Sequence, residues 1–143
     1  MALVELFGNE VVGKSGNVQT SSLESKDVVG IYFSAHWCPP CRNFTPVLAA
    51  NYTSLTEQGK AFEIVFVSSD REEGEAQSYY DSMPWLMLPF GERDRKNDLS
   101  KKYSVSGIPT LVLVDAKTGE TITKEGRGIL SNADCGQSFP WKN

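Results

Sequence analysis

The sequence predicts an α/β fold in which helices cover both faces of a central mixed β-sheet. Three short apolar runs, residues 28–33, 64–67 and 111–114, are rich in β-branched side chains and do not alternate with polar residues. Such runs are typical of strands that are covered on both faces. A segment with helical periodicity separates the first two runs, so strand, helix and strand are expected to form a right-handed crossover.

The helix of that crossover is predicted over residues 40–58. Its apolar residues recur at spacings of three and four: Phe44, Leu48, Tyr52 and Leu55. This spacing places them on one stripe of a helix, which faces the sheet. Gly59 follows directly, and glycine commonly ends a helix.

A second helix is expected after the second strand, over residues 70–82. The dipeptide Ser69-Asp70 precedes Glu72 and Glu73, which gives an N-cap followed by acidic residues in the first turn. Pro84 stops the helix, since proline is not accepted in a helix interior.

The remaining elements are shorter. A third helix is predicted over residues 94–103, and the third strand is expected to turn at Gly119 into a hairpin partner at residues 120–124. Residues 3–7 and 18–23 are expected to add an edge hairpin at the N-terminus. Together these elements predict helices on both faces of a mixed sheet.

Composition limits the class of protein. The chain has 143 residues, of which 40% are apolar, enough to fill one core in one domain. Its net charge of −4 argues against binding to nucleic acid or to an anionic membrane. The first apolar run breaks at Gly8, too early for a signal peptide, and no apolar stretch approaches the ~20 residues that span a bilayer. We therefore expect a soluble protein of the cytoplasm, with the nucleus left open.

The chemically informative segment is Trp37-Cys38-Pro39-Pro40-Cys41-Arg42, where a buried strand ends and a helix begins. A thiol in the first turn of a helix faces unpaired N–H groups and the positive end of the macrodipole, and both stabilise a thiolate. Cys38 is therefore the expected nucleophile. Cys41, one helical turn further, reaches the same sulfur from a deeper position and suits the resolving role in thiol–disulfide exchange. Pro39 and Pro40 stiffen the loop without disturbing the first turn.

Other uses of the cysteines are weaker hypotheses. His36 and Cys135 could complete a four-ligand zinc site with Cys38 and Cys41, but a second CxxC pair is missing and prolines fill the intervening positions. We therefore predict no metal. His36 is expected to be an exposed neighbour that tunes Cys38 electrostatically. Cys135 is interpreted as a spare thiol, with a regulatory cysteine as the alternative.

Residues 33–42 resemble the thioredoxin-like domain of the nucleoredoxins and of the related tryparedoxins. Further landmarks of that family follow in the same order: Val67-Ser68-Ser69-Asp70-Arg71, Met83-Pro84-Trp85-Leu86, Gly107-Ile108-Pro109-Thr110-Leu111 and Phe139-Pro140-Trp141. The resemblance covers nearly the whole chain. It implies a thioredoxin fold with an N-terminal β-hairpin extension. The single domain would span residues 1–143, with the extension at 1–26 and the core and C-terminal segment at 27–143.

The resemblance also implies roles for individual residues. Pro109 matches the cis-proline of the loop that faces the active-site cysteines, and the backbone of Ile108 would then pair with an extended substrate segment. Trp37 would be a partly exposed contact surface beside the nucleophile. Pro46 matches the proline that kinks the helix after the cysteines. Arg127 matches an arginine near the tryparedoxin active site, with a solvated surface charge as the alternative.

Two positions depart from related families. Thioredoxin has a buried aspartate that acts as base for the resolving thiol, and this chain has Tyr32 there. A tyrosine with an ordinary pKa near 10 is a poor base at neutral pH, so water or another group is expected to deprotonate Cys41. Arg71 replaces an acidic residue of tryparedoxins, although neighbouring acids remain: Asp70, Glu72 and Glu73. These details favour the nucleoredoxin side of the family.

We therefore predict a monomeric thiol–disulfide oxidoreductase that reduces protein disulfides through Cys38 and Cys41. No GxGxxG motif indicates a bound flavin or dinucleotide, so the dithiol would be restored by an external reductant: a thioredoxin reductase system, glutathione or a related dithiol. One alternative is a redox-sensitive binding module that regulates signalling partners without turnover. Another is an exported reductant for periplasmic cytochrome maturation, which the missing export segment and the Phe139-Pro140-Trp141 ending disfavour.

Overall fold

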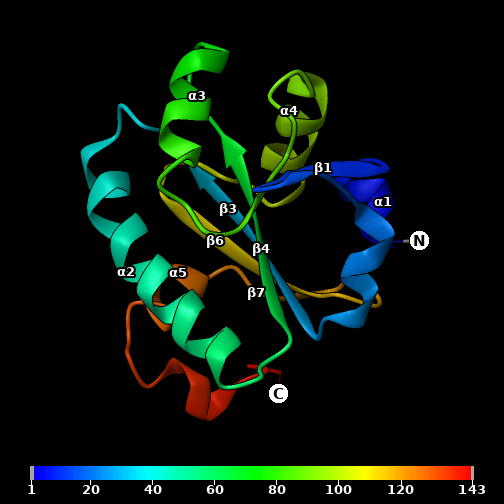
Figure 1. Ribbon diagram of the computed structural model, residues 1–143, viewed down its shortest axis with the longest axis vertical. Coiled ribbons are helices and arrows are strands. Elements are labelled where there is room, and N and C mark those ends of the chain that lie inside the picture. Colours follow the sequence, from blue (N-terminus) through cyan, green and yellow to red (C-terminus); the bar gives the residue numbers. More distant parts are fainter. Residues whose placement is uncertain (1, 143) are drawn as a thin grey trace.

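The computed structural model describes residues 2–142, which form one mixed sheet between two layers of helices (Figure 1). The strands are β1 (Glu10–Gly13), β2 (Gly16–Gln19), β3 (Val28–Ser34), β4 (Phe62–Ser68), β5 (Leu86–Met87), β6 (Thr110–Asp115) and β7 (Thr121–Thr123). The α-helices are α1 (Ala2–Phe7), α2 (Pro39–Glu57), α3 (Glu73–Tyr80), α4 (Arg93–Lys102) and α5 (Gly126–Ile129). Two 3-10 helices, η1 (Thr20–Ser25) and η2 (Cys135–Ser138), complete the fold.

The three predicted apolar strands form the middle of the sheet, whose order is β2-β1-β5-β4-β3-β6-β7. Strand β3 pairs in parallel with β4 and antiparallel with β6, and every residue of β3 is buried. Burial on both faces explains why these runs do not alternate in polarity. Because β3 is paired on both sides, the loop that follows it is held in a fixed position at the C-terminal end of that strand.

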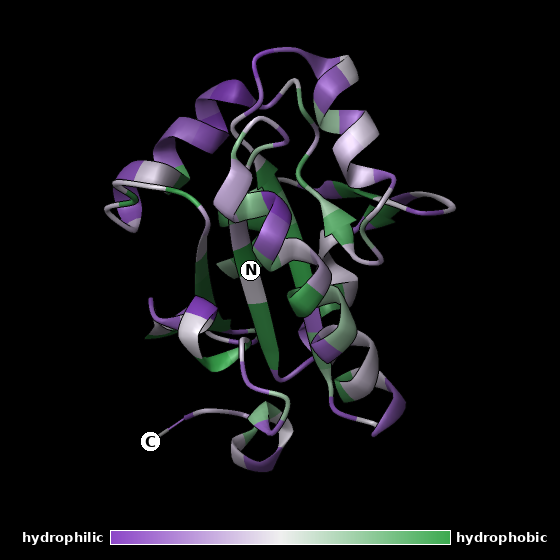
Figure 2. Cartoon of the chain, turned by 90° about the vertical axis from the view of Figure 1, so that its left-hand side faces the viewer, coloured by the Kyte–Doolittle hydropathy of each residue, from purple (hydrophilic) through white to green (hydrophobic). Residues whose placement is uncertain are grey.

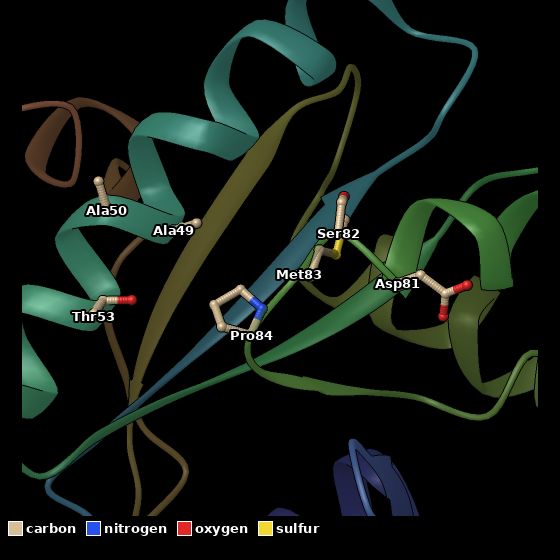
Figure 3. Close-up of a pocket in the computed structure, with 7 residues that line it drawn as sticks. All are labelled: Ala49, Ala50, Thr53, Asp81, Ser82, Met83 and Pro84. Carbon is tan, nitrogen blue, oxygen red and sulfur yellow. The ribbon is translucent and has the colours of Figure 1, made fainter.

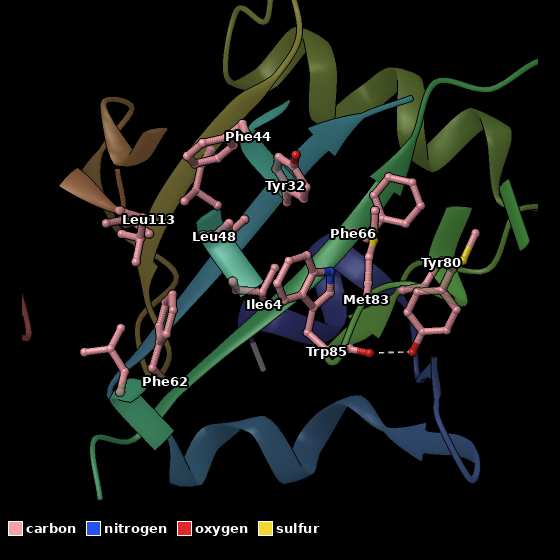
Figure 4. Close-up of a cluster of buried hydrophobic side chains, with 14 of the residues drawn as sticks. Tyr32, Phe44, Leu48, Phe62, Ile64, Phe66, Tyr80, Met83, Trp85 and Leu113 are labelled. Carbon is pink, nitrogen blue, oxygen red and sulfur yellow. Dashed lines mark hydrogen bonds between the residues drawn. The ribbon is translucent and has the colours of Figure 1, made fainter. Parts of the chain in front are cut away.

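Helices α2 and α3 cover one face of the sheet, and α1 and α4 cover the other. The first face buries an aromatic cluster in which the Tyr32 ring lies 5.9 Å from Trp85 and 6.2 Å from Phe66 (Figure 4). Figure 2 shows the central strands as hydrophobic and the outward turns of the helices as mostly hydrophilic. Among residues 2–142, no helix has the length and apolar character needed to cross a membrane.

The N-terminal prediction was wrong in its bounds. Residues 3–7 form helix α1 rather than a strand, because Leu3 and Phe7 lie four residues apart and are both buried against the sheet. The hairpin lies later, in β1 and β2, with its turn at residues 14 and 15 and with Gly16 directly after the turn at a φ of 124°. Residues 20–23, expected in the second strand of that hairpin, belong to η1 instead.

The other predicted helices are present with shifted bounds. Helix α2 begins at Pro39 and continues through Pro46, and Gly59 follows it with a φ of 81°. Helix α4 agrees with its prediction to within one residue at each end. Helix α3 was predicted to begin at residue 70 but begins at Glu73. The carboxylate of Asp70 instead accepts hydrogen bonds from residues outside this helix. Strand β5, helix α5 and η2 were not predicted.

Candidate active site

The two cysteines lie where β3 leads into α2, beyond the C-terminal end of that strand. Cys38 is the N-cap of α2, with a φ of −94° and a ψ of 110°, and its Sγ accepts a hydrogen bond from the backbone N–H of Cys41 at 3.3 Å. Pro39 and Pro40 are the first two residues of the helix, and both are exposed. The sulfur of Cys38 therefore caps the helix at its positive end, the placement expected to stabilise a thiolate.

Cys41 lies deeper than Cys38, as the helical spacing predicts. Its side chain is fully buried, whereas Cys38 is 4% exposed, and both are free thiols. The pKa of the Cys41 thiol is raised to about 11, chiefly by burial and also by its hydrogen bond with Cys38, against the opposing effect of Ser34. Cys41 is therefore protonated at neutral pH until some group takes its proton.

Ile108 and Pro109 lie against the cysteines and are joined by a cis peptide bond, as the resemblance implied. The carbonyl oxygen of Ile108 accepts a hydrogen bond from Cys38 Sγ at 3.7 Å, and the Ile108 side chain packs on a small buried cluster: Ala35, Cys38 and Cys41. The structure thus brings together segments about seventy residues apart in the chain.

Trp37 is an exposed aromatic residue beside the nucleophile. Its side chain is 52% exposed, and its Nε1 donates a hydrogen bond to the carbonyl oxygen of Ser69 at 3.2 Å. The indole is therefore held in place while most of its surface remains open to solvent. A large exposed aromatic side chain with a fixed orientation is well suited to contact another molecule.

Asp70 anchors this loop, and its predicted role as helix N-cap was wrong. The carboxylate is buried and accepts hydrogen bonds from the backbone N–H of His36 at 2.8 Å and from Ser68 Oγ at 2.7 Å. It is therefore turned inward, unlike the exposed side chains of Glu72 and Glu73. Buried carboxylates need such donors, and these tie the active-site loop to the end of β4.

Arg127 and Cys135 are the two remaining residues that the sequence singled out. Arg127 is exposed on α5, with its guanidinium carbon 6.0 Å from the ring of Phe44 on α2. Cys135 is buried in the core beneath α2, and desolvation raises the pKa of its thiol. Within residues 2–142, histidine, cysteine and acidic side chains do not gather in threes as a metal site requires.

A buried cluster of hydroxyls behind Cys41 was not predicted from the sequence. Ser34 and Thr45 both hydrogen-bond to the hydroxyl of Tyr79, and Thr45 also bonds to Tyr32. Burial raises the pKa of Tyr32 far above its ordinary value, so this residue is an even poorer base than expected. His36, predicted to be exposed, is half-buried and stacks on Tyr79 at 5.1 Å. These residues come from separate elements, so no spacing in the sequence indicates them.

A surface hollow of about 480 Å³ lies away from the cysteine loop, between α2 and the turn after α3 (Figure 3). Its lining includes Ala49 and Thr53 on one side and Ser82 and Pro84 on the other. A smaller hollow of about 210 Å³ lies nearer the cysteine loop. It is lined by His36, Arg42, Thr45, Pro46, Tyr79 and Ser82.

A model of the thioredoxin-like family matches residues 26–121. The chain belongs to the thioredoxin-like family. Nucleoredoxin of Homo sapiens is 47% identical over 139 residues, covering 96% of this chain and 31% of its own length. The chain thus spans about a third of the nucleoredoxins it matches. Tryparedoxin of Trypanosoma brucei brucei is 44% identical over 133 residues, covering 93% of this chain and 91% of the relative.

Solved structures of this family confirm the predicted thioredoxin fold. Tryparedoxin from Trypanosoma brucei superimposes with a TM-score of 0.91 at 42% identity, covering 99% of both chains. Tryparedoxin II in complex with glutathionylspermidine gives a TM-score of 0.92 at 37% identity, covering 100% of both chains. The family, its fold and the Cys38-Cys41 motif support a thiol–disulfide redox function.

Proposed function

We propose that the protein reduces disulfide bonds in other proteins through a dithiol–disulfide cycle of Cys38 and Cys41. The observation that carries this proposal is the pairing of Cys38, capping α2, with Cys41 bonded to it through the 3.3 Å N–H to sulfur contact. The exposed Trp37 and the backbone of Ile108 border the same sulfur and supply a surface for an extended substrate segment.

The cycle has two displacement steps. The Cys38 thiolate attacks one sulfur of the substrate disulfide, forming a mixed disulfide, and the other substrate sulfur leaves as a thiolate that takes a proton from water. Cys41 then loses its proton and attacks the Cys38 sulfur. This second step closes the Cys38–Cys41 disulfide and releases the remaining substrate sulfur as a thiolate, which is also protonated.

An external reductant restores Cys38 and Cys41 to the dithiol state in this proposal. Tryparedoxin II binds glutathionylspermidine in its solved complex, which supports a small thiol as one candidate class of reductant. Turnover of insulin disulfides should be compared with a thioredoxin reductase system, with glutathione and with a trypanothione-type dithiol. We expect one of these to sustain turnover well above the other two.

The proposal is tested by the two single serine variants. Cys38→Ser should abolish insulin reduction, because it removes the nucleophile, and Cys41→Ser should stop turnover after one mixed disulfide. Cys135→Ser is the matched control, since that thiol is buried away from the site, and it should retain activity. Reduction that persists in Cys38→Ser would contradict the proposal. Stoichiometric partner capture that survives Cys38→Ser would favour the redox-sensitive binding module instead.

A further inference from the structure

The second step of the proposed cycle requires Cys41 to lose a proton inside the protein. Its thiol is fully buried, and Tyr32 stands where thioredoxin carries an aspartate. The side chain of Tyr32 is equally buried and faces Thr45 rather than solvent. The proton therefore needs another route, and the inference that follows rests on the proposed function.

A continuous chain of buried hydroxyls runs from Ser34 to Tyr32. Hydrogen bonding from the Ser34 hydroxyl lowers the pKa of the Cys41 thiol. The Ser34 Oγ also bonds to the hydroxyl of Tyr79 at 2.8 Å. Tyr79 bonds in turn to Thr45 Oγ1 at 2.6 Å, and Thr45 bonds to the Tyr32 hydroxyl at 2.6 Å. All four hydroxyl residues are at most 4% exposed. Hydrogen bonds of this kind polarise one another in a low-dielectric interior.

Counting hydrogens shows which protonation state the chain fits. Three hydrogen bonds join the four hydroxyls. A fourth, from Ser34 to the sulfur, is made when Cys41 is a thiolate, which is why Ser34 lowers the pKa of that thiol. When Cys41 is a thiolate, the four hydroxyl hydrogens fill the four bonds, and all can point toward the sulfur. When Cys41 is a thiol, five hydrogens share four bonds, so one must leave the chain.

The chain reaches solvent at Thr45. Thr45 and Tyr79 line the 210 Å³ hollow near the cysteine loop, together with His36 and Arg42. His36 stacks on the Tyr79 ring with an angle of 3° between the planes, which fixes the ring that carries the central hydroxyl. Thr45, two hydroxyls beyond Ser34 in the chain, is thus placed against a space where water can accept a proton.

We propose that Ser34, Tyr79 and Thr45 relay the proton of the Cys41 thiol to water in this hollow. The thiol hydrogen passes to Ser34, the Ser34 hydrogen to Tyr79 and the Tyr79 hydrogen to Thr45, while Thr45 gives its own hydrogen to water. Each hydroxyl ends neutral and donates toward the new thiolate. In this relay Ser34 exchanges a proton with the reacting sulfur, whereas Tyr79 and Thr45 are positioning residues that act through Ser34.

The chromogenic disulfide DTNB tests the relay directly, because it separates the two steps. One thionitrobenzoate is released when Cys38 attacks, and the second when Cys41 resolves the mixed disulfide. We expect Tyr79→Phe to slow the second release by about tenfold or more and to leave the first within about twofold of wild type. The solvent deuterium isotope effect on the second release should also decrease.

Two controls distinguish a relay from a structural role. Tyr80→Phe removes a buried hydroxyl that donates to the carbonyl oxygens of Trp85 and Val12, outside the chain, and should leave both releases unchanged. Thr45→Val should slow the second release, and Thr45→Ser should restore it. A second release at the wild-type rate in Tyr79→Phe, or equal slowing in both Thr45 variants, would overturn the relay. If the wild-type protein released both thionitrobenzoates from DTNB but did not reduce insulin, that result would contradict the proposed function and not the relay.

Discussion

Replacing Asp70 by alanine removes the buried carboxylate that joins the active-site loop to the end of β4. Two donors then lose their acceptor: the backbone N–H of His36 and the hydroxyl of Ser68. An unpaired buried donor costs about 1–3 kcal/mol, and water entering the space left by the carboxylate recovers part of this. We therefore expect Asp70→Ala to lower the free energy of unfolding by about 3 kcal/mol.

Asp70→Asn gives a graded comparison. Asparagine retains one acceptor oxygen for the His36 N–H, and its amide can donate to Ser68 Oγ, so only the Ser68 hydroxyl loses its acceptor. The expected loss is about 1 kcal/mol. Glu72→Ala is the matched control, because this nearby acid is exposed, and it should change stability by less than about 0.5 kcal/mol.

Urea unfolding followed by tryptophan fluorescence measures these differences. With a slope of about 2 kcal/mol per molar urea, Asp70→Ala should lower the midpoint by about 1.5 M and Asp70→Asn by about 0.5 M. If Asp70→Ala has the same midpoint as wild type, the carboxylate does not hold the loop. If Asp70→Asn is as unstable as Asp70→Ala, charge rather than hydrogen bonding explains its role.

Three further outcomes are expected. Gly126→Ala places a Cβ 2.6 Å from the backbone oxygen of Leu111 and should lower the free energy of unfolding by about 2 kcal/mol in thermal or urea melts; an unchanged melt would contradict the packing. Trp37→Ala should leave stability within about 1 kcal/mol but raise KM for insulin without slowing DTNB, and an unchanged KM would exclude Trp37 as a contact. The Lys142 ammonium holds the pKa of Asp115 well below its usual range. The stability that this carboxylate contributes is therefore present above about pH 4 and is lost as the pH falls. Asp115→Asn should show a smaller drop in urea midpoint between pH 7 and acid than wild type does.

The sequence predicts the centre of the fold well, because burial in the core alone determines which residues form it. Strands β3, β4 and β6 are buried on both faces, so a run of hydrophobic residues is enough to predict each of them. Helix α2 has a single apolar stripe and a glycine after its last turn. The placement of Cys38 at the start of that helix follows from these two elements.

The edges of the fold are less predictable because tertiary contacts decide them. Residues 3–7 suit a strand or a helix by composition, and only the packing of Leu3 and Phe7 against the sheet selects the helix. Asp70 has the sequence context of an N-cap, yet its carboxylate accepts from the backbone N–H of His36 and the hydroxyl of Ser68 instead. Strand β5 has two residues, too few for a periodic pattern.

The candidate site shows the same division. The cysteines and Pro109 are carried by motifs, so their positions are predicted. The hydroxyl chain joins residues from β3, α2 and α3, with a separation of 45 residues between Ser34 and Tyr79. Tyrosines, serines and threonines are common in any chain, so only the folded structure shows which of them meet.

Intact-mass analysis of a trapped mixed disulfide tests the central claim most directly. Reduced Cys41→Ser protein is mixed with a peptide that contains one disulfide, and the mass is read after excess peptide is removed. The account predicts one stable adduct, mapped to Cys38 by proteolysis, and no adduct on the protein when Cys38 is also replaced by serine. Adduct formation at Cys135, or no adduct on Cys38, would contradict the assignment of Cys38 as the nucleophile.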